Sequence, residues 1–77
     1  MRKDIFYHEL AQLIHTHRRH SGLTRIELAE LAGVGKTVVY DLEHGKQTIR
    51  LDTLIKILKV LNMTLECKGP FSTQLQK

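Results

Sequence analysis

The stretch "TRIELAELAGVGKTVVYDLE", which begins at Thr24, constrains the fold of this 77-residue chain more than any other. Thr24 followed three residues later by Glu27 is a capping box, which predicts that a helix starts here. Gly33 suits the left-handed backbone that ends a helix. The residues beyond it predict another helix from about Gly35 to His44. The chain must therefore fold around two short helices that are joined at a glycine.

The apolar positions of this stretch predict how the two helices pack. Leu28, Ala29, Leu31 and Ala32 are expected to face inward from the first helix, and Val39 and Leu42 from the second. Ala29 is small, which lets the two helices cross closely. Two helices and a glycine-containing turn of about three residues form the helix-turn-helix arrangement.

The glycines of this stretch also resemble the end of a phosphate-binding loop, G-x-x-x-x-G-K-[ST]. That motif requires a glycine where Glu30 stands, and a strand before the loop where this sequence predicts a helix. We therefore exclude nucleotide binding of this kind.

The flanking segments predict two further helices. Before Gly22, helical spacing gives one apolar stripe, consisting of Phe6, Leu10, Leu13, Ile14 and His17. After the loop "HGKQTI", the segment "LDTLIKILKVLN" predicts a fourth helix. Its apolar residues cover more than the single stripe that a surface helix needs. This excess predicts that part of helix four is buried against another chain.

The segment "MTLECK" alternates in the way that a half-buried strand does. Met63, Leu65 and Cys67 would face inward, and Thr64, Glu66 and Lys68 outward. A lone strand in a helical chain has unpaired backbone groups, so we expect it to pair with its copy in a homodimer. The predicted fold is all-α, a four-helix bundle with this short C-terminal strand. Residues 1–69 form the domain, and residues 70–77 a mobile tail.

Composition favours an anionic partner and gives little support to other classes. Twelve Lys and Arg against eight Asp and Glu give a net charge of +4, which favours nucleic acid. The single cysteine, Cys67, excludes an internal disulfide and fits a reducing cytoplasm. We expect neither a signal peptide nor a membrane segment. Of His15, His17 and His20 only two share a helix face, so we expect no metal site. The sequence offers no specific set of nucleophile, base and orienting group, so we expect no enzymatic activity, and we expect no cofactor.

From Gly22 to Leu61 the chain resembles the Cro/repressor-type, or Xre, helix-turn-helix family. The matching residues are "GLTRIELAELAGVGKTVVYDLEHGK". More narrowly, "VVYDLEHGKQTIRLDTLIKILKVLNMTLEC" is similar to the HipB-like antitoxins. The resemblance implies a dimer that binds operator DNA, represses its own operon and binds a HipA-type serine/threonine kinase toxin. It also implies a cytoplasmic, nucleoid-associated location.

In such a fold the third helix enters the major groove. Its exposed face provides the candidate base contacts, which are Lys36, Thr37, Tyr40 and Asp41. Asp41 could accept a hydrogen bond from cytosine, or could repel unsuitable sequences as a solvent-exposed carboxylate. The candidate phosphate contacts are Arg25, Lys36, Lys46 and Arg50. At the position of Arg25 the family commonly has Gln, and a guanidinium binds phosphate more strongly than an amide.

The resemblance further implies a partly buried ion pair between Arg18 and Glu43 that fixes the packing of helices one and three. Two surface charges without structural effect are the alternative. Three functions remain open at this point. The protein could be an antitoxin that also represses transcription, a free-standing repressor without a toxin, or an interaction module that no longer binds DNA.

Overall fold

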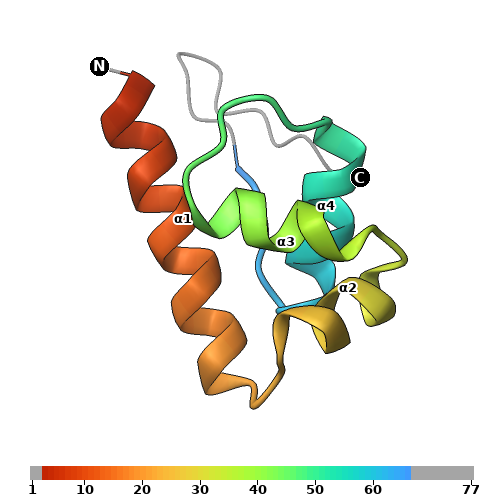
Figure 1. Cartoon of the computed structure of the whole chain (residues 1–77). Coiled ribbons are helices and arrows are strands. Elements are labelled where there is room, and N and C mark those ends of the chain that lie inside the picture. Colours follow the sequence, from red (N-terminus) through yellow and green to blue (C-terminus); the bar gives the residue numbers. More distant parts are fainter. Residues whose placement is uncertain (1–2, 67–77) are drawn as a thin grey trace.

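The structure is a computed structural model that describes residues 3–66 of the chain. Within these residues it has four helices, α1 (Lys3–His20), α2 (Arg25–Ala32), α3 (Lys36–Glu43) and α4 (Leu51–Val60). In Figure 1 α1 runs along one side of the molecule, α3 crosses the middle, and α2 and α4 lie on the other side. α3 contacts both α1 and α2, and α2 also contacts α4. The predicted four-helix fold is therefore confirmed.

Local signals set the ends of α2 as the sequence predicts. The Thr24 hydroxyl accepts a hydrogen bond from the Glu27 amide at 3.1 Å, and the Glu27 carboxylate accepts one from the Thr24 amide at 2.8 Å. Together they form the predicted capping box. Gly33 ends the helix with φ of 72°. This left-handed backbone conformation is unfavourable for residues other than glycine.

The core lies where the four helices meet. Four side chains are fully buried in it, one from each helix, namely Ile14, Leu28, Val39 and Ile57. Ala29 is also buried in this core. α3 thus has one face committed to the core and the other left to solvent.

The apolar stripe predicted for α1 is wrong in part. Ile14 is buried, but Phe6 and Leu13 are about half exposed. Ala11 and Arg18 take the inward positions instead. Two neighbouring stripes satisfy the helical period almost equally well, and periodicity alone favours the one that contains more apolar residues. A buried arginine becomes acceptable only when another element provides a partner for its charge.

The predicted strand is absent over residues 63–66, which form no strand in the described part of the chain. Met63 and Leu65 do face inward, as the alternation predicts, and both pack against the core of their own chain. A strand needs a neighbouring strand for its backbone groups, and residues 3–66 contain none. Cys67, Lys68 and the predicted tail lie outside the described residues. Pairing across a homodimer stays a prediction.

No helix among the described residues is both long enough and apolar enough to span a membrane.

Two leucines of α2 give a matched test of this core. Leu28 is fully buried, whereas Leu31, which the sequence predicts to face inward, is 64% exposed. Leu28→Ala should lower the free energy of unfolding by about 2–5 kcal/mol, because it leaves a cavity. Leu31→Ala should change it by less than about 0.5 kcal/mol. Urea denaturation followed by circular dichroism measures both, and equal losses would contradict the packing described.

Candidate nucleic-acid interface

A buried ion pair joins α1 to α3. Nε of Arg18 donates to Oε2 of Glu43 at 2.6 Å, and a terminal nitrogen of Arg18 donates to Oε1 at 3.2 Å. Another terminal nitrogen of Arg18 donates to the Leu23 carbonyl at 2.8 Å. The Glu43 side chain is fully buried and that of Arg18 is 8% exposed. The structure thus brings together the two residues that the sequence predicts as a pair.

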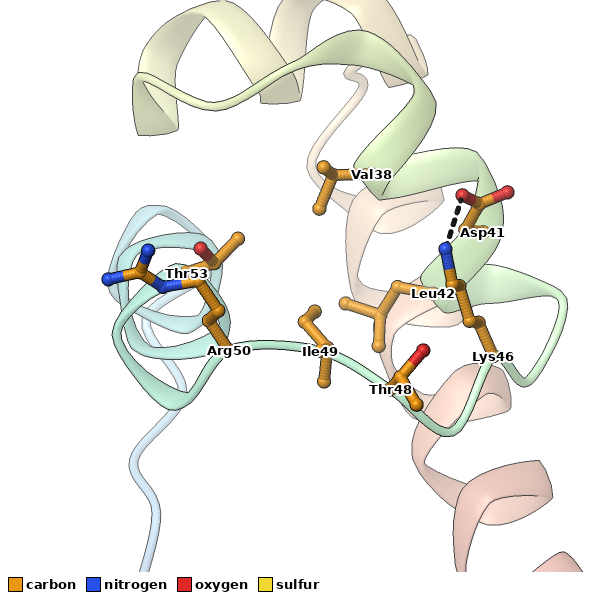
Figure 2. A pocket seen from close by; sticks show the side chains of 8 residues that line it. All are labelled: Val38, Asp41, Leu42, Lys46, Thr48, Ile49, Arg50 and Thr53. Carbon is orange, nitrogen blue, oxygen red and sulfur yellow. Dashed lines mark ion pairs between the residues drawn. The ribbon is translucent and has the colours of Figure 1, made fainter.

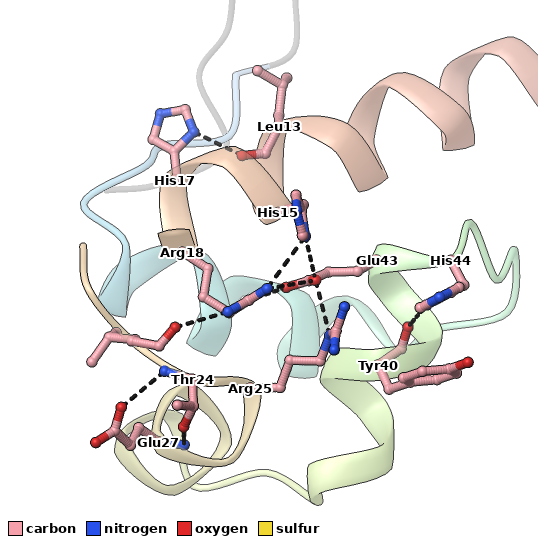
Figure 3. Close-up of polar contacts among 11 residues, drawn as sticks. Leu13, His15, His17, Arg18, Thr24, Arg25, Glu27, Tyr40, Glu43 and His44 are labelled. Carbon is pink, nitrogen blue, oxygen red and sulfur yellow. Dashed lines mark hydrogen bonds and ion pairs between the residues drawn. The ribbon is translucent and has the colours of Figure 1, made fainter. Parts of the chain in front are cut away.

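Two more side chains bind the same carboxylate, as Figure 3 shows. Nδ1 of His15 lies 2.8 Å from Oε1 of Glu43, and Nε of Arg25 donates to Oε1 at 3.1 Å. Because a carboxylate only accepts hydrogen bonds, Nδ1 of His15 carries the hydrogen in this contact. Glu43 therefore links α3 to α1, through His15 and Arg18, and to the first residue of α2, Arg25.

The surroundings of Glu43 determine its ionisation. Burial by itself raises the pKa of the carboxyl group, but the hydrogen bonds from Arg18 and His15 and the positive charge of Arg18 act in the opposite direction. The net effect lowers the pKa of Glu43 below its ordinary value. The ionised form is thus the one that the three helices hold.

Tyr40 lies one turn before the end of α3, and two neighbours contact its ring. The central carbon of the Arg25 guanidinium lies 5.5 Å from the ring centroid, within the range of a cation–π contact. The His44 ring stacks on it with 3.9 Å between centroids. Nδ1 of His44 also lies 2.7 Å from the Tyr40 carbonyl oxygen. Because a carbonyl oxygen only accepts hydrogen bonds, Nδ1 carries the hydrogen in this contact, which orients the His44 ring. The Tyr40 side chain is held in place while half of it remains exposed.

The exposed face of α3 borders a basic depression. Lys36 and Thr37 are exposed at the start of the helix, and Tyr40 follows one turn later. A depression of about 580 Å³ runs from these residues to the end of α1 and the start of α2. It is lined by His15, Arg18, Arg19, Thr24, Arg25, Ile26, Lys36, Thr37 and Tyr40. Five of these nine side chains are basic, and three of the five, His15, Arg18 and Arg25, contact the Glu43 carboxylate.

Other predicted contact residues lie around a second hollow, between α3 and α4 (Figure 2). It has a volume of about 210 Å³, and Val38, Leu42 and Ile49 are among its lining residues. At its edge Lys46 pairs with Asp41 at 3.6 Å. Arg50, also at this edge, pairs instead with Asp52 at 3.1 Å. The structure therefore divides the predicted residues into a group at the basic depression and a group at the loop after α3.

Comparison with known families decides what this arrangement is. Residues 14–66 match the HTH_3 helix-turn-helix family, and the match spans more than half of the chain. The chain belongs to the HTH_3 family. The predicted Xre-type helix-turn-helix is thereby confirmed, whereas the narrower HipB-like resemblance stays a prediction. Fold and family together place the chain among the helix-turn-helix transcriptional regulators.

Two curated proteins of similar sequence come from different bacteria. The chain is 31% identical over 62 residues to an uncharacterized HTH-type transcriptional regulator, y4mF, of Sinorhizobium fredii, covering 80% of this chain and 82% of the relative. It is 30% identical over 56 residues to the control protein C.SmaI of Serratia marcescens, covering 73% of this chain and 67% of that protein.

A solved HTH_3 structure supports the same assignment. The chain is similar to the crystal structure of an HTH_3 family transcriptional regulator from Vibrio cholerae, with a TM-score of 0.72 and 27% identity. The similarity covers 82% of this chain but only 35% of the Vibrio chain. This chain therefore corresponds to about a third of that larger HTH_3 protein.

Two histidines of α1 contact oxygen atoms of this chain. Nδ1 of His17 lies 2.8 Å from the Leu13 carbonyl of its own helix, and Nδ1 of His15 faces Glu43. Over residues 3–66 no three His, Cys, Asp or Glu side chains are grouped so that they could hold a metal ion.

Three contacts of this site were missed by the sequence predictions. They are His15 with Glu43, Arg25 with Glu43, and the stacking of Tyr40 on His44. Spacing could have indicated two of them. His15 precedes Arg18 by three residues and Tyr40 precedes His44 by four, and both separations place side chains on one helix face. The contact of Arg25 with Glu43 crosses between helices and leaves no local pattern.

The lowered pKa of Glu43 predicts a pH-dependent stability. The ionised carboxylate should contribute fully above the ordinary Glu pKa of 4.5. Its contribution should be lost as the pH falls through the lower pKa of the folded state. Urea unfolding between pH 7 and pH 3 measures this dependence, and Glu43→Gln should flatten it. Glu30→Gln, at an exposed position of α2, is the matched control and should leave it unchanged. A Glu43→Gln variant with the wild-type dependence would contradict the assignment.

Proposed function

We propose that this protein is a sequence-specific DNA-binding repressor that reads its operator with the exposed face of α3. The observation that carries the proposal is the position of Lys36, Thr37 and Tyr40. They are exposed on α3 beside the basic depression. A helix of this kind fits the major groove, where its N-terminal residues reach the base edges.

Each side chain has a chemical role in this proposal. Thr37 offers a methyl group to thymine and a hydroxyl to a base edge, and Tyr40 offers a phenol group and an apolar ring face. Lys36 donates to guanine or to phosphate. Asp41 already pairs with Lys46, which favours a role in rejecting unsuitable sequences over one as an acceptor for cytosine.

Phosphate contacts come from the edges of this surface. The side chains of Lys46 and Arg50 are 54% and 83% exposed, and each pairs with an exposed carboxylate. Such pairs contribute little in water, so a DNA phosphate can replace the carboxylate without a large cost. The start of α2 borders the basic depression, and a helix N-terminus favours an anion.

We also propose that the repressor acts as a homodimer through residues 63–68 and the outer face of α4. Leu51 is 55% exposed and Ile55 is half-buried, so one side of α4 has apolar surface that a second copy would cover. Residues 63–66 alternate as a strand does, and a second copy would provide a neighbouring strand. A two-fold axis there would set two copies of α3 roughly 34 Å apart, as a palindromic site requires.

For its cellular role we propose an antitoxin, cytoplasmic and nucleoid-associated, that represses its own operon and binds a HipA-type kinase toxin. The similarity of residues 38–67 to HipB-like antitoxins supports this role. The second candidate is a free-standing repressor, which the relatives favour because one is named a transcriptional regulator and the other a control protein.

Substitutions in α3 and in the following loop should affect DNA binding differently. Thr37→Ala or Tyr40→Ala should weaken the free energy of DNA binding by about 1–3 kcal/mol, because each removes a base contact. The loss should appear mainly on a duplex that the wild-type protein selects by sequence. Lys46→Ala should weaken specific and non-specific binding alike and reduce the salt dependence by the equivalent of about one phosphate contact. Fluorescence anisotropy at several salt concentrations, on a selected and a random duplex, measures these effects. Unchanged specificity in both α3 variants would remove α3 as the reading helix.

The dimer should depend on backbone hydrogen bonds near residue 65. Leu65→Pro removes a backbone donor and should produce a monomer with weakened operator binding, although residue 65 does not touch DNA. Leu65→Val keeps the donor and an apolar side chain, so it should remain dimeric. Sedimentation velocity at micromolar concentration measures both. A monomeric wild type, or a dimeric Leu65→Pro variant, would contradict the proposed interface.

The antitoxin role predicts a stable complex with a kinase. The native-host protein, tagged and purified under mild conditions, should retain a HipA-type kinase that mass spectrometry identifies, and the gene next to its own should encode that kinase. Recovery of promoter DNA without a kinase, together with no kinase gene nearby, would favour the free-standing repressor.

A further inference from the structure

The hollow between α3 and α4 has an apolar floor. Val38, Leu42 and Ile49 line it, and Figure 2 shows these side chains directed toward the same space. Leu42 is buried in the core, and Val38 and Ile49 pack against that core. The floor is therefore held by the packing of the fold itself. Preformed apolar hollows with a few polar groups are the usual form of a small-molecule site.

A cation and a hydroxyl group stand at the edge of this floor. The backbone amide of Lys46 donates to the Asp41 carbonyl at 3.0 Å, which holds the start of the loop against α3. Nζ of Lys46 lies 3.6 Å from Oδ2 of Asp41, and Thr48 of the same loop also lines the hollow. A positive charge and a hydroxyl beside an apolar surface favour a ligand with one anionic group and one apolar group.

The ion pair that Lys46 now makes is easily exchanged. Its two charged atoms are farther apart than in a good hydrogen bond, and the Lys46 and Asp41 side chains are 54% and 40% exposed. Such a pair contributes little in water, so the carboxylate of a ligand can replace that of Asp41. Arg50 differs, because it makes two hydrogen bonds to Asp52, at 3.1 Å and 3.2 Å. In Figure 2 its guanidinium lies on the opposite side of the hollow from Lys46.

The volume of the hollow sets the size of its ligand. It measures about 210 Å³, whereas an apolar cavity of about 150 Å³ is enough to hold a benzene ring. A single ring therefore fits, with room for a short side group that reaches the edge. A nucleotide is too large for this space, and a carboxylate on a short side group would reach Lys46.

We propose that this hollow is a binding site for a small monocarboxylate with one aromatic ring. The ring packs on Val38, Leu42 and Ile49, and the carboxylate binds Lys46 in place of Asp41. One consequence rests on the proposed function, in which Lys46 contacts a DNA phosphate. The bound carboxylate occupies that charge, so the ligand lowers the affinity for DNA, and DNA lowers the affinity for the ligand by the same factor.

An NMR titration with phenylacetate tests the site without DNA. The methyl signals of Val38, Leu42 and Ile49 should shift with a saturating dependence, whereas those of Leu31, an exposed leucine of α2, should not. Acetate has the carboxylate but no ring, so it should bind at least about tenfold more weakly. Methyl signals that do not shift, or that respond equally to acetate, would overturn the proposal.

Three variants test the role of the charges at the edge. Lys46→Gln should lower the affinity for phenylacetate about two- to fivefold and leave that for the neutral phenylacetamide unchanged. Asp41→Asn removes the competing carboxylate and should raise the affinity for phenylacetate by a similar factor. Arg50→Gln removes the same charge as Lys46→Gln and should have no effect. Equal losses in Lys46→Gln and Arg50→Gln, or weaker binding by Asp41→Asn, would contradict the proposed position of the carboxylate.

Fluorescence anisotropy with a DNA duplex tests the consequence for DNA binding. Saturating phenylacetate should weaken binding of the wild type by about the same factor as Lys46→Ala does, and should not affect the Lys46→Ala variant. Acetate at equal concentration controls for ionic strength. A wild type that binds no DNA would contradict the proposed function and leave the NMR result intact. Equal DNA affinity with and without phenylacetate would overturn the competition at Lys46.

Discussion

The fold depends on one buried carboxylate. Glu43 is the last residue of α3, and its two oxygens accept hydrogen bonds from α1 and from the first residue of α2. A buried carboxylate without partners would be strongly unfavourable. Here Arg18 supplies a compensating charge at 2.6 Å and also binds the Leu23 carbonyl in the turn between α1 and α2. The apolar core draws the helices together without direction, whereas Glu43 imposes a particular alignment on three of them.

The same alignment determines what α3 can present outside. Its buried residues Val39 and Leu42 fix one face, and Glu43 fixes its end. Lys36, Thr37 and Tyr40 are then left on the exposed side, next to the positive charges of α1 and α2. Arg25 extends this arrangement from the interior to the Tyr40 ring. Under the proposed function, stability and DNA recognition therefore depend on the same residue, and a change at Glu43 should disturb both.

The sequence predicted most where the signals are local. The capping box of Thr24 and Glu27, the left-handed Gly33 and the buried Val39 and Leu42 follow from spacing within a few residues. The predictions were wrong where two neighbouring stripes of one helix fit the helical repeat almost equally well. Phe6 and Leu13 belong to the stripe of α1 that the apolar residues favour, yet Ala11 and Arg18, on the neighbouring stripe, face inward. Glu43 on another helix makes the buried arginine acceptable. The strand at residues 63–66 required a neighbouring strand, which periodicity cannot provide.

A double-mutant cycle between Arg18 and Glu43 tests the central role of this carboxylate most directly. Arg18→Met and Glu43→Gln should each lower the free energy of unfolding by up to about 3–5 kcal/mol, because each leaves a buried polar group without its partner. The double variant should lose less than the sum, with a coupling energy above about 1 kcal/mol. Urea unfolding of the four proteins at neutral pH gives that coupling directly. Losses that simply add would show that the pair does not align the helices.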